Sequence, residues 1–162
     1  MAHPLASELL VVATDAGLKV TTAESCTGGM VSAAITDIAG SSAIFTHGFV
    51  TYSNDAKQQL LDVQPSTLVA FGAVSEQTAL EMAEGARRAA GADVAVAITG
   101  IAGPGGSEHK PEGRVCFAVA TGSENKAQTI EFGALGRSAV RAAARDHALS
   151  LLIKCCAQFP PK

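Results

Sequence analysis

Three stretches of the chain carry apolar or small residues at helical spacing and end at a glycine. They are residues 4–16 before Gly17, residues 30–39 before Gly40, and residues 76–90 before Gly91. Apolar positions three and four apart form one face of a helix, and glycine commonly ends it. We therefore expect helices over these ranges, the third of them capped by Ser75.

Three more helical segments are indicated by their first residues or by their spacing. Ser53 or Asn54 caps a helix that runs through Leu61, a short helical turn follows Pro65, and the last helix covers residues 137–156. Ser and Asn accept hydrogen bonds from the free N–H groups of a helix start, and proline fits its first turn.

Between these helices the pattern changes to short β-rich runs. We expect strands at residues 18–22, 48–52, 93–99, 114–121 and 127–132. The run DVAVAIT at 93–99 is almost entirely apolar, as in a central strand covered on both faces. The last two runs pair as a hairpin across residues 122–126. This order predicts an α/β fold, a three-layer α/β/α sandwich whose mixed sheet includes a C-terminal β-hairpin.

Composition adds limits to this picture. The chain has 162 residues, 48% apolar and 17% charged, with a net charge of −3. We expect one domain over residues 1–162, with no affinity for nucleic acid or anionic membranes. No apolar run has the length of a membrane span, and the first residues do not resemble a signal peptide.

Cysteine and histidine usage bears on compartment and on metals. The four cysteines show no C-x-x-C spacing, and two of them are adjacent. This indicates reduced thiols in a cytoplasmic protein, and no grouping of Cys, His, Asp or Glu has the spacing of a metal site. We expect no metal.

Hydroxyl groups, glycines and ionisable side chains gather in three segments that follow predicted strands. These are residues 23–29, 52–57 and 99–106. Ligand sites of open α/β sheets lie beyond the carboxyl ends of the strands. The three segments are therefore the candidate site.

The first segment contains ESCTGG, which allows three interpretations. Gly28 and Gly29 before a helix could offer N–H groups to an anion, or form an oxyanion hole beside a nucleophile at Ser25. The motif lacks the spacing of a P-loop or of a dinucleotide fingerprint. Taken alone, it is more typical of a tight turn.

A serine nucleophile requires a base, and Lys57 is better placed for that role than any of the four histidines. It lies in the first turn of a predicted helix, where burial and the positive helix end lower the pKa of an amine. Tyr52, the single tyrosine, lies at the same strand end and could relay a proton or orient Lys57. Cys26 at a helix start is an alternative nucleophile, although a small buried thiol is commoner. Two alternatives without a catalytic role remain open: Lys57 could be a solvated surface lysine, and Tyr52 could be an aromatic residue at the rim of the site.

The last predicted helix carries arginines four residues apart. Arg137, Arg141 and Arg145 share one face, two of them in the opening turns where the helix dipole disfavours cations. The pattern indicates an anionic ligand, a phosphate in particular, or a solvated basic face.

Longer motifs occur in a fixed order along the chain. They are VTTAESCTGG, ITDIAGSS, GFVTYSNDAK, AITGIAGPGG with a following KPEGRV, and GRSAVRAAA. In these motifs the chain resembles the CinA C-terminal domain family in its stand-alone amidase form, over nearly its whole length. One departure is Glu112 in SEHKPEG, where an apolar residue is expected.

The resemblance implies hydrolysis of the carboxamide of nicotinamide mononucleotide to nicotinate mononucleotide and ammonia. It implies Ser25 as the nucleophile, Lys57 as its base with help from Tyr52, and Thr99 in the same pocket. Neither a metal nor a redox cofactor is implied. From charge and placement we add the substrate-binding candidates Thr27, Gly28, Gly29, Gly100, Gly105, Arg137 and Arg141. The first three would supply oxyanion N–H groups, and the glycine loop and the arginines would hold the phosphate.

Two other functions use the same loops. The domain could bind a nucleotide without turning it over, as a sensor or interaction module, or it could hydrolyse another small carboxamide. Its small-residue helices favour a homo-oligomer.

Overall fold

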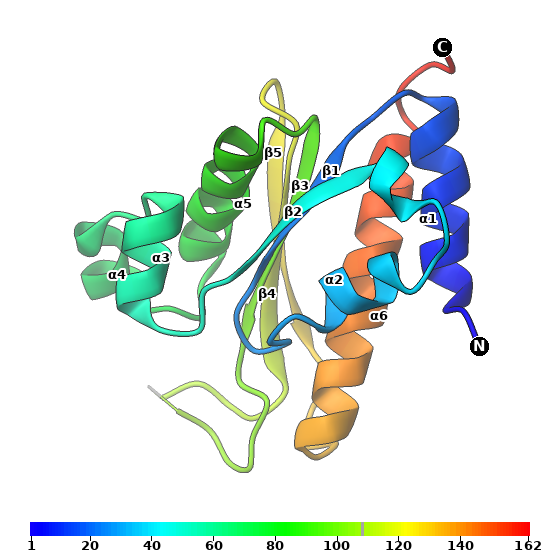
Figure 1. Ribbon diagram of the computed structural model, residues 1–162. Helices are drawn as coiled ribbons and strands as arrows, with labels where there is room; N and C mark the ends of the chain where they lie inside the picture. The colour runs from blue at the N-terminus through cyan, green and yellow to red at the C-terminus, as the bar shows by residue number, and fades with distance from the viewer. Residues whose placement is uncertain (108) are drawn as a thin grey trace.

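A five-stranded mixed sheet runs through the middle of the molecule (Figure 1). The computed structural model describes residues 1–107 and 109–162. The strands are β1 (Val20–Glu24), β2 (Phe45–Val50), β3 (Val94–Gly100), β4 (Arg114–Ala120) and β5 (Asn125–Glu131). Their order is β2-β1-β3-β4-β5, with β1 parallel to β2 and β3, and β4 antiparallel to β3 and β5. The predicted C-terminal hairpin is confirmed.

Helices cover both faces of this sheet. They are α1 (Pro4–Asp15), α2 (Met30–Thr36), α3 (Asn54–Leu61), α4 (Pro65–Phe71), α5 (Glu76–Ala90) and α6 (Arg137–Cys156), with a 3₁₀ turn η1 (Ser41–Ala43). Figure 1 shows α1, α2 and α6 on one side of the sheet and α3, α4 and α5 on the other. The predicted three-layer α/β/α sandwich is confirmed.

The two faces of the sheet differ in side-chain size. Branched and aromatic residues point toward α1, α2 and α6, among them Val94, Val96, Ile98 and Phe117. Alanines point toward α5, namely Ala23, Ala95, Ala97, Ala118 and Ala120. Because successive side chains of a strand alternate between faces, the run VAVAI builds both cores at once. Because alanine side chains are small, α5 can lie close to this face of the sheet.

The first two strands are shifted by two or three residues from their predicted positions. The strand expected at 18–22 is β1 at Val20–Glu24, and the strand expected at 48–52 is β2 at Phe45–Val50. Every residue of β1 is buried, including Glu24, whose carboxylate is satisfied inside the protein as described below. β2 is an edge strand with mostly exposed residues, so its sequence carries little hydrophobic signal.

The remaining boundaries differ by a few residues at most. α2 ends at Thr36, three residues before the predicted end. In the hairpin, Ala120 pairs with Asn125 and Val119 with Lys126, so the connecting turn is shorter than predicted. Ser53 and Ser75 cap α3 and α5 as expected, each accepting a hydrogen bond from a backbone N–H.

The parallel register brings three chain segments to one edge of the sheet. The Thr51 N–H donates to the Glu24 carbonyl at 2.8 Å, and the Ser25 N–H donates to the Ile98 carbonyl at 2.9 Å. The residues that follow β1, β2 and β3 are therefore neighbours. No helix in residues 1–107 or 109–162 is long and apolar enough to cross a membrane.

Candidate active site

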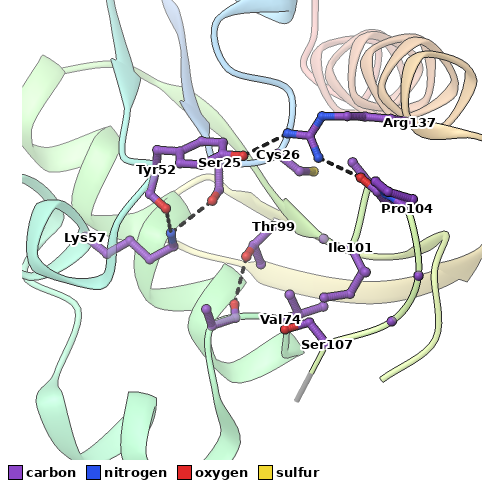
Figure 2. Close-up of a pocket in the computed structure, with 16 residues that line it drawn as sticks. Ser25, Cys26, Tyr52, Lys57, Val74, Thr99, Ile101, Pro104, Ser107 and Arg137 are labelled. Carbon is purple, nitrogen blue, oxygen red and sulfur yellow. Dashed lines mark hydrogen bonds between the residues drawn. The ribbon is translucent and has the colours of Figure 1, made fainter. Parts of the chain in front are cut away.

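Ser25 and Lys57 form a hydrogen-bonded pair at the carboxyl end of the parallel strands. The Lys57 Nζ lies 3.0 Å from the Ser25 Oγ, and Figure 2 shows the two side chains meeting at the base of a pocket. Ser25 is the first residue after β1, and Lys57 lies one turn into α3. A nucleophile and its base require contact at about 2.6–3.2 Å, and this pair meets that requirement.

The surroundings of Lys57 suit a base. Its side chain is fully buried, and Nζ lies 2.7 Å from the Thr51 carbonyl oxygen and 3.5 Å from that of Tyr52. Burial lowers the pKa of Lys57 from 10.5 to about 8. In the described part of the chain, Lys57 has no carboxylate partner that would hold the proton on. A neutral amine is therefore accessible near neutral pH.

A tight turn carries Ser25 from β1 into α2. The Gly28 N–H donates to the Ser25 carbonyl at 3.0 Å, which closes the turn. Gly28 and Gly29 both have positive φ, 58° and 105°, a conformation that side-chain-bearing residues rarely adopt. The glycine pair of ESCTGG is thus required by the backbone.

The start of α2 is occupied by a buried carboxylate. Glu24 accepts hydrogen bonds from the N–H groups of Gly29, Val31 and Ser32 at 2.9–3.2 Å, and from the Ser32 hydroxyl at 2.8 Å. These N–H groups would otherwise bind an anion. The interpretation of ESCTGG as a phosphate cradle is therefore wrong, because Glu24 fills that position.

The oxyanion donors differ from those expected. The N–H groups of Gly28 and Gly29 are engaged with Ser25 and Glu24, whereas those of Cys26 and Thr27 have no acceptor among the described residues. Cys26 follows the nucleophile directly and lines the pocket. The N–H after a nucleophilic serine is the usual oxyanion donor in strand–turn–helix sites. As candidate oxyanion donors the free N–H groups of Cys26 and Thr27 therefore replace those of Gly28 and Gly29.

The Cys26 side chain is poorly suited to attack. It is 5% exposed, and burial raises the pKa of its thiol to about 11. A thiol with that pKa stays protonated at neutral pH, and the thiolate is the reactive form. Lys57 contacts the Ser25 hydroxyl, so of these two adjacent residues the geometry favours Ser25.

A cavity of about 320 Å³ opens above the Ser25–Lys57 pair. Its wall consists of Ser25, Cys26, Tyr52, Lys57, Ala73, Val74, Thr99, Arg137 and residues 100–107. Ligand pockets typically occupy about 300–1,000 Å³, so this one fits a small molecule. Within the described ranges, no three His, Cys, Asp or Glu side chains lie together as metal ligands would.

Tyr52 and Arg137 form the mouth of the cavity. The Arg137 guanidinium donates to the Tyr52 hydroxyl at 2.9 Å and to the Gly103 carbonyl at 2.7 Å (Figure 2). Tyr52 is 62% exposed, and its contact with Lys57 is made by its main-chain carbonyl. Tyr52 thus meets Lys57 through its main chain while its phenol meets Arg137, and its part in catalysis stays a prediction.

Thr99 faces the cavity at the end of β3. Its hydroxyl donates to the Ala73 carbonyl at 2.8 Å, and the residue is 1% exposed. Because the Thr99 hydroxyl donates its proton to the Ala73 carbonyl, its oxygen can act only as an acceptor toward the cavity. It can accept a hydrogen bond from a substrate N–H.

Two charged residues that the sequence analysis did not select fix the loop between β3 and β4. Glu112 accepts from the Gly105 N–H at 2.8 Å, and the Lys110 ammonium donates to the carbonyls of Phe71 and Val74 at 2.8 and 2.5 Å. Glu112, the departure noted above, therefore has a local partner. Only the position of Lys110 and Glu112 within KPEG gave any signal in the sequence.

A profile of the CinA C-terminal domain matches residues 2–156. The chain belongs to the CinA C-terminal domain family.

Relatives cover most of the chain. Nicotinamide-nucleotide amidohydrolase PncC from Escherichia coli is 57% identical over 137 residues, 84% of this chain and 83% of that protein. PncC from Enterobacter agglomerans is 52% identical over 154 residues, 94% and 93% of the two chains. The crystal structure of competence damage-inducible protein A from Klebsiella pneumoniae superposes with a TM-score of 0.94 at 37% identity, covering 98% and 99%.

Among the residues that we assigned to this CinA-family site, the structure separates two groups. Ser25, Lys57, Tyr52, Thr99, Gly100, Gly105 and Arg137 line the cavity. Thr27, Gly28, Gly29 and Arg141 lie outside its wall. The Arg141 guanidinium instead donates to the carbonyls of Cys26 and Thr27 at 3.0 and 3.2 Å. The expectation that Arg141 contacts a substrate phosphate is not supported.

Proposed function

We propose that this chain hydrolyses the carboxamide of nicotinamide mononucleotide to nicotinate mononucleotide and ammonia. The observation that carries the proposal is the buried Ser25–Lys57 pair, 3.0 Å apart, at the base of a cavity of small-molecule size. The name and high identity of the PncC relatives indicate the substrate. A sensor that only bound a nucleotide would not need a buried lysine on a serine hydroxyl.

In the first step Ser25 attacks the carboxamide carbon. Neutral Lys57 has two N–H bonds, directed to the Thr51 and Tyr52 carbonyls, and one lone pair left for the Ser25 hydroxyl proton. As the Oγ–C bond forms, that proton moves to the Lys57 Nζ and the carbonyl oxygen becomes an oxyanion. The Cys26 N–H stabilises this charge, an effect commonly worth about 3 kcal/mol per donor.

The tetrahedral intermediate then collapses to an acyl-enzyme. Lys57 returns the proton to the amide nitrogen, the C–N bond breaks, and ammonia leaves. A water molecule loses a proton to the same amine and attacks the ester, and Lys57 protonates the Ser25 Oγ as it departs. The products are the carboxylic acid and the free hydroxyl of Ser25, so one residue acts as base and acid in both halves.

Two parts of the cavity wall account for recognition. Thr99 presents an acceptor that suits the amide N–H₂ of the substrate and disfavours the product carboxylate. Arg137 at the mouth is the cation that we assign to the phosphate, beside the glycine-rich residues 103–106. Tyr52 offers an exposed ring next to it.

The proposal is tested by ammonia release from nicotinamide mononucleotide. We expect release by the wild type and a loss of about 10⁴-fold or more in Ser25→Ala, as for other nucleophile deletions. Ser123→Ala in the hairpin turn is the control and keeps full activity. Circular dichroism verifies that the Ser25→Ala variant is folded.

Each other result selects a different function. Equal release by wild type and Ser25→Ala contradicts the serine mechanism. Binding of the nucleotide without release by either protein supports the sensor function. Faster release from carboxamides that lack a 5′-phosphate supports an amidase for another substrate.

A further inference from the structure

Arg141 links helix α6 to the turn that carries the nucleophile. Its Nε donates to the Cys26 carbonyl at 3.0 Å and its Nη2 to the Thr27 carbonyl at 3.2 Å, across more than 110 residues of sequence. Both acceptors are main-chain atoms of the two residues after Ser25. The guanidinium is partly buried and lies outside the cavity wall, with two of its nitrogens engaged by the main chain.

The two contacts fix peptide planes as well as positions. In a trans peptide the C=O and the following N–H point in opposite directions. With the Cys26 carbonyl on Arg141, the Thr27 N–H faces away from α6. With the Thr27 carbonyl on Arg141, the Gly28 N–H points the other way, to the Ser25 carbonyl, and the Cys26 N–H of that next peptide faces away from the turn interior.

Neither of these two N–H groups has an acceptor among the described residues. Their directions depend on a short turn in which Gly28 and Gly29 have positive φ. Glycine gives such a turn many accessible conformations, so an external constraint is needed to hold one. Arg141 supplies two hydrogen bonds from one planar group, which an ammonium cannot do with the same geometry.

We propose that Arg141 is a positioning residue that holds the Ser25–Thr27 turn so that its free N–H groups meet the oxyanion. The proposal rests on the proposed hydrolytic function. Arg141 touches neither substrate nor the reacting atoms, and it acts through the main chain of Cys26 and Thr27.

The experiment compares Arg141→Ala and Arg141→Lys with Arg145→Ala. Arg145 lies one turn further along α6 and donates to Asp146, away from the turn. For Arg141→Ala we expect kcat for nicotinamide mononucleotide to fall about 10²-fold, the cost of misplacing a reacting group by about 1 Å, with KM nearly unchanged. Arg141→Lys is intermediate, and Arg145→Ala matches the wild type.

Two further readouts separate positioning from a structural role. Added guanidinium at non-denaturing concentration partly restores kcat of Arg141→Ala and does nothing for Ser25→Ala. The pH at half-maximal kcat stays that of the wild type, because Lys57 and its carbonyl partners are unaltered. A raised KM with unchanged kcat, or wild-type kinetics in Arg141→Ala, overturns the proposal.

A failure of the proposed function is distinguishable from a failure of this inference. Wild type that releases no ammonia contradicts the function. The rate at which phenylmethanesulfonyl fluoride labels Ser25, followed by intact mass, then reports on the turn, since it uses the same nucleophile and oxyanion donors. Slower labelling of Arg141→Ala supports the positioning role, and equal labelling overturns it.

Discussion

At the scale of single residues, the burial of Lys57 determines how activity depends on pH. Burial lowers its pKa to about 8, so below that pH most molecules carry the ammonium, which has no lone pair for the Ser25 proton. We therefore expect kcat/KM to rise as the pH increases from 6 to 9, with a midpoint near 8. Steady-state rates in buffers of constant ionic strength measure this profile.

The control for that profile is Lys57→Ala. Its residual activity should show no rise near pH 8, since the titrating base is gone. A wild-type profile that is flat or falls over this range would mean that Lys57 does not act as a neutral base.

The sequence predicted which residues lie together at the cavity better than it predicted their individual contacts. The position of Lys57 in the first helical turn after a strand made it a candidate base, and the structure places it against Ser25. Ser25 and Cys26 are adjacent after the same strand, so residue pattern alone left their choice open, and the contact with Lys57 favours Ser25. Arg137 and Arg141 share a helix face, yet Arg137 lines the cavity and Arg141 donates hydrogen bonds to the main-chain carbonyls of Cys26 and Thr27. Spacing cannot distinguish these roles, because they depend on the loop each side chain meets.

At the scale of elements, α5 packs against α3 through a glycine. A Cβ atom at Gly85 would overlap the main-chain carbonyl of Leu61, which cannot rotate away as a side chain could. Overpacking commonly costs about 1–3 kcal/mol, partly offset by about 1 kcal/mol from the better helix propensity of alanine. Because the overlap is with main chain, we expect the upper half of the remaining range, so that Gly85→Ala lowers the free energy of unfolding by about 1–2 kcal/mol in urea denaturation.

The matched variant for this change is Arg88→Ala, on the exposed face of the same helix. It should alter stability by less than about 0.5 kcal/mol. A Gly85→Ala protein as stable as the wild type would mean that α3 and α5 can separate without loss of packing.

Prediction of the elements succeeded at α3 and α5, where a capping serine or a glycine marks the end, and was less accurate at α2, which ends before Gly40. Ser53, Ser75 and Gly91 bound α3 and α5 as expected. The predicted strand ended before the true end of β1, because an acidic residue such as Glu24 is typical of a loop. In the structure the Glu24 carboxylate is buried and accepts hydrogen bonds from N–H groups at the start of α2. These hydrogen bonds form only in the folded protein, so the local sequence pattern around Glu24 does not indicate them.

At the scale of the whole molecule, the order of the strands in the sheet determines how well each strand's backbone amides are protected from hydrogen exchange. β3 lies between β1 and β4 and is covered on both faces, with five residues fully buried from Val94 to Ile98. β2 and β5 are edge strands with mostly exposed residues. Local opening is easiest where few buried contacts must break.

We therefore expect native-state hydrogen exchange to be slowest in β3 and to approach the global unfolding free energy there. Amides of β2 and β5 should exchange through smaller openings. Residue-resolved exchange by NMR measures this order, and equal protection of β3 and β5 would contradict it.

The hairpin has a practical consequence. β4 starts beside the cavity loop and runs antiparallel to β3, so the turn at residues 121–124 lies at the opposite end of the sheet from the carboxyl ends of β1 and β3 (Figure 1). None of its residues lines the cavity. A fluorophore, an affinity tag or a surface tether attached at this turn would leave substrate access open, making it the natural handle for immobilising the protein.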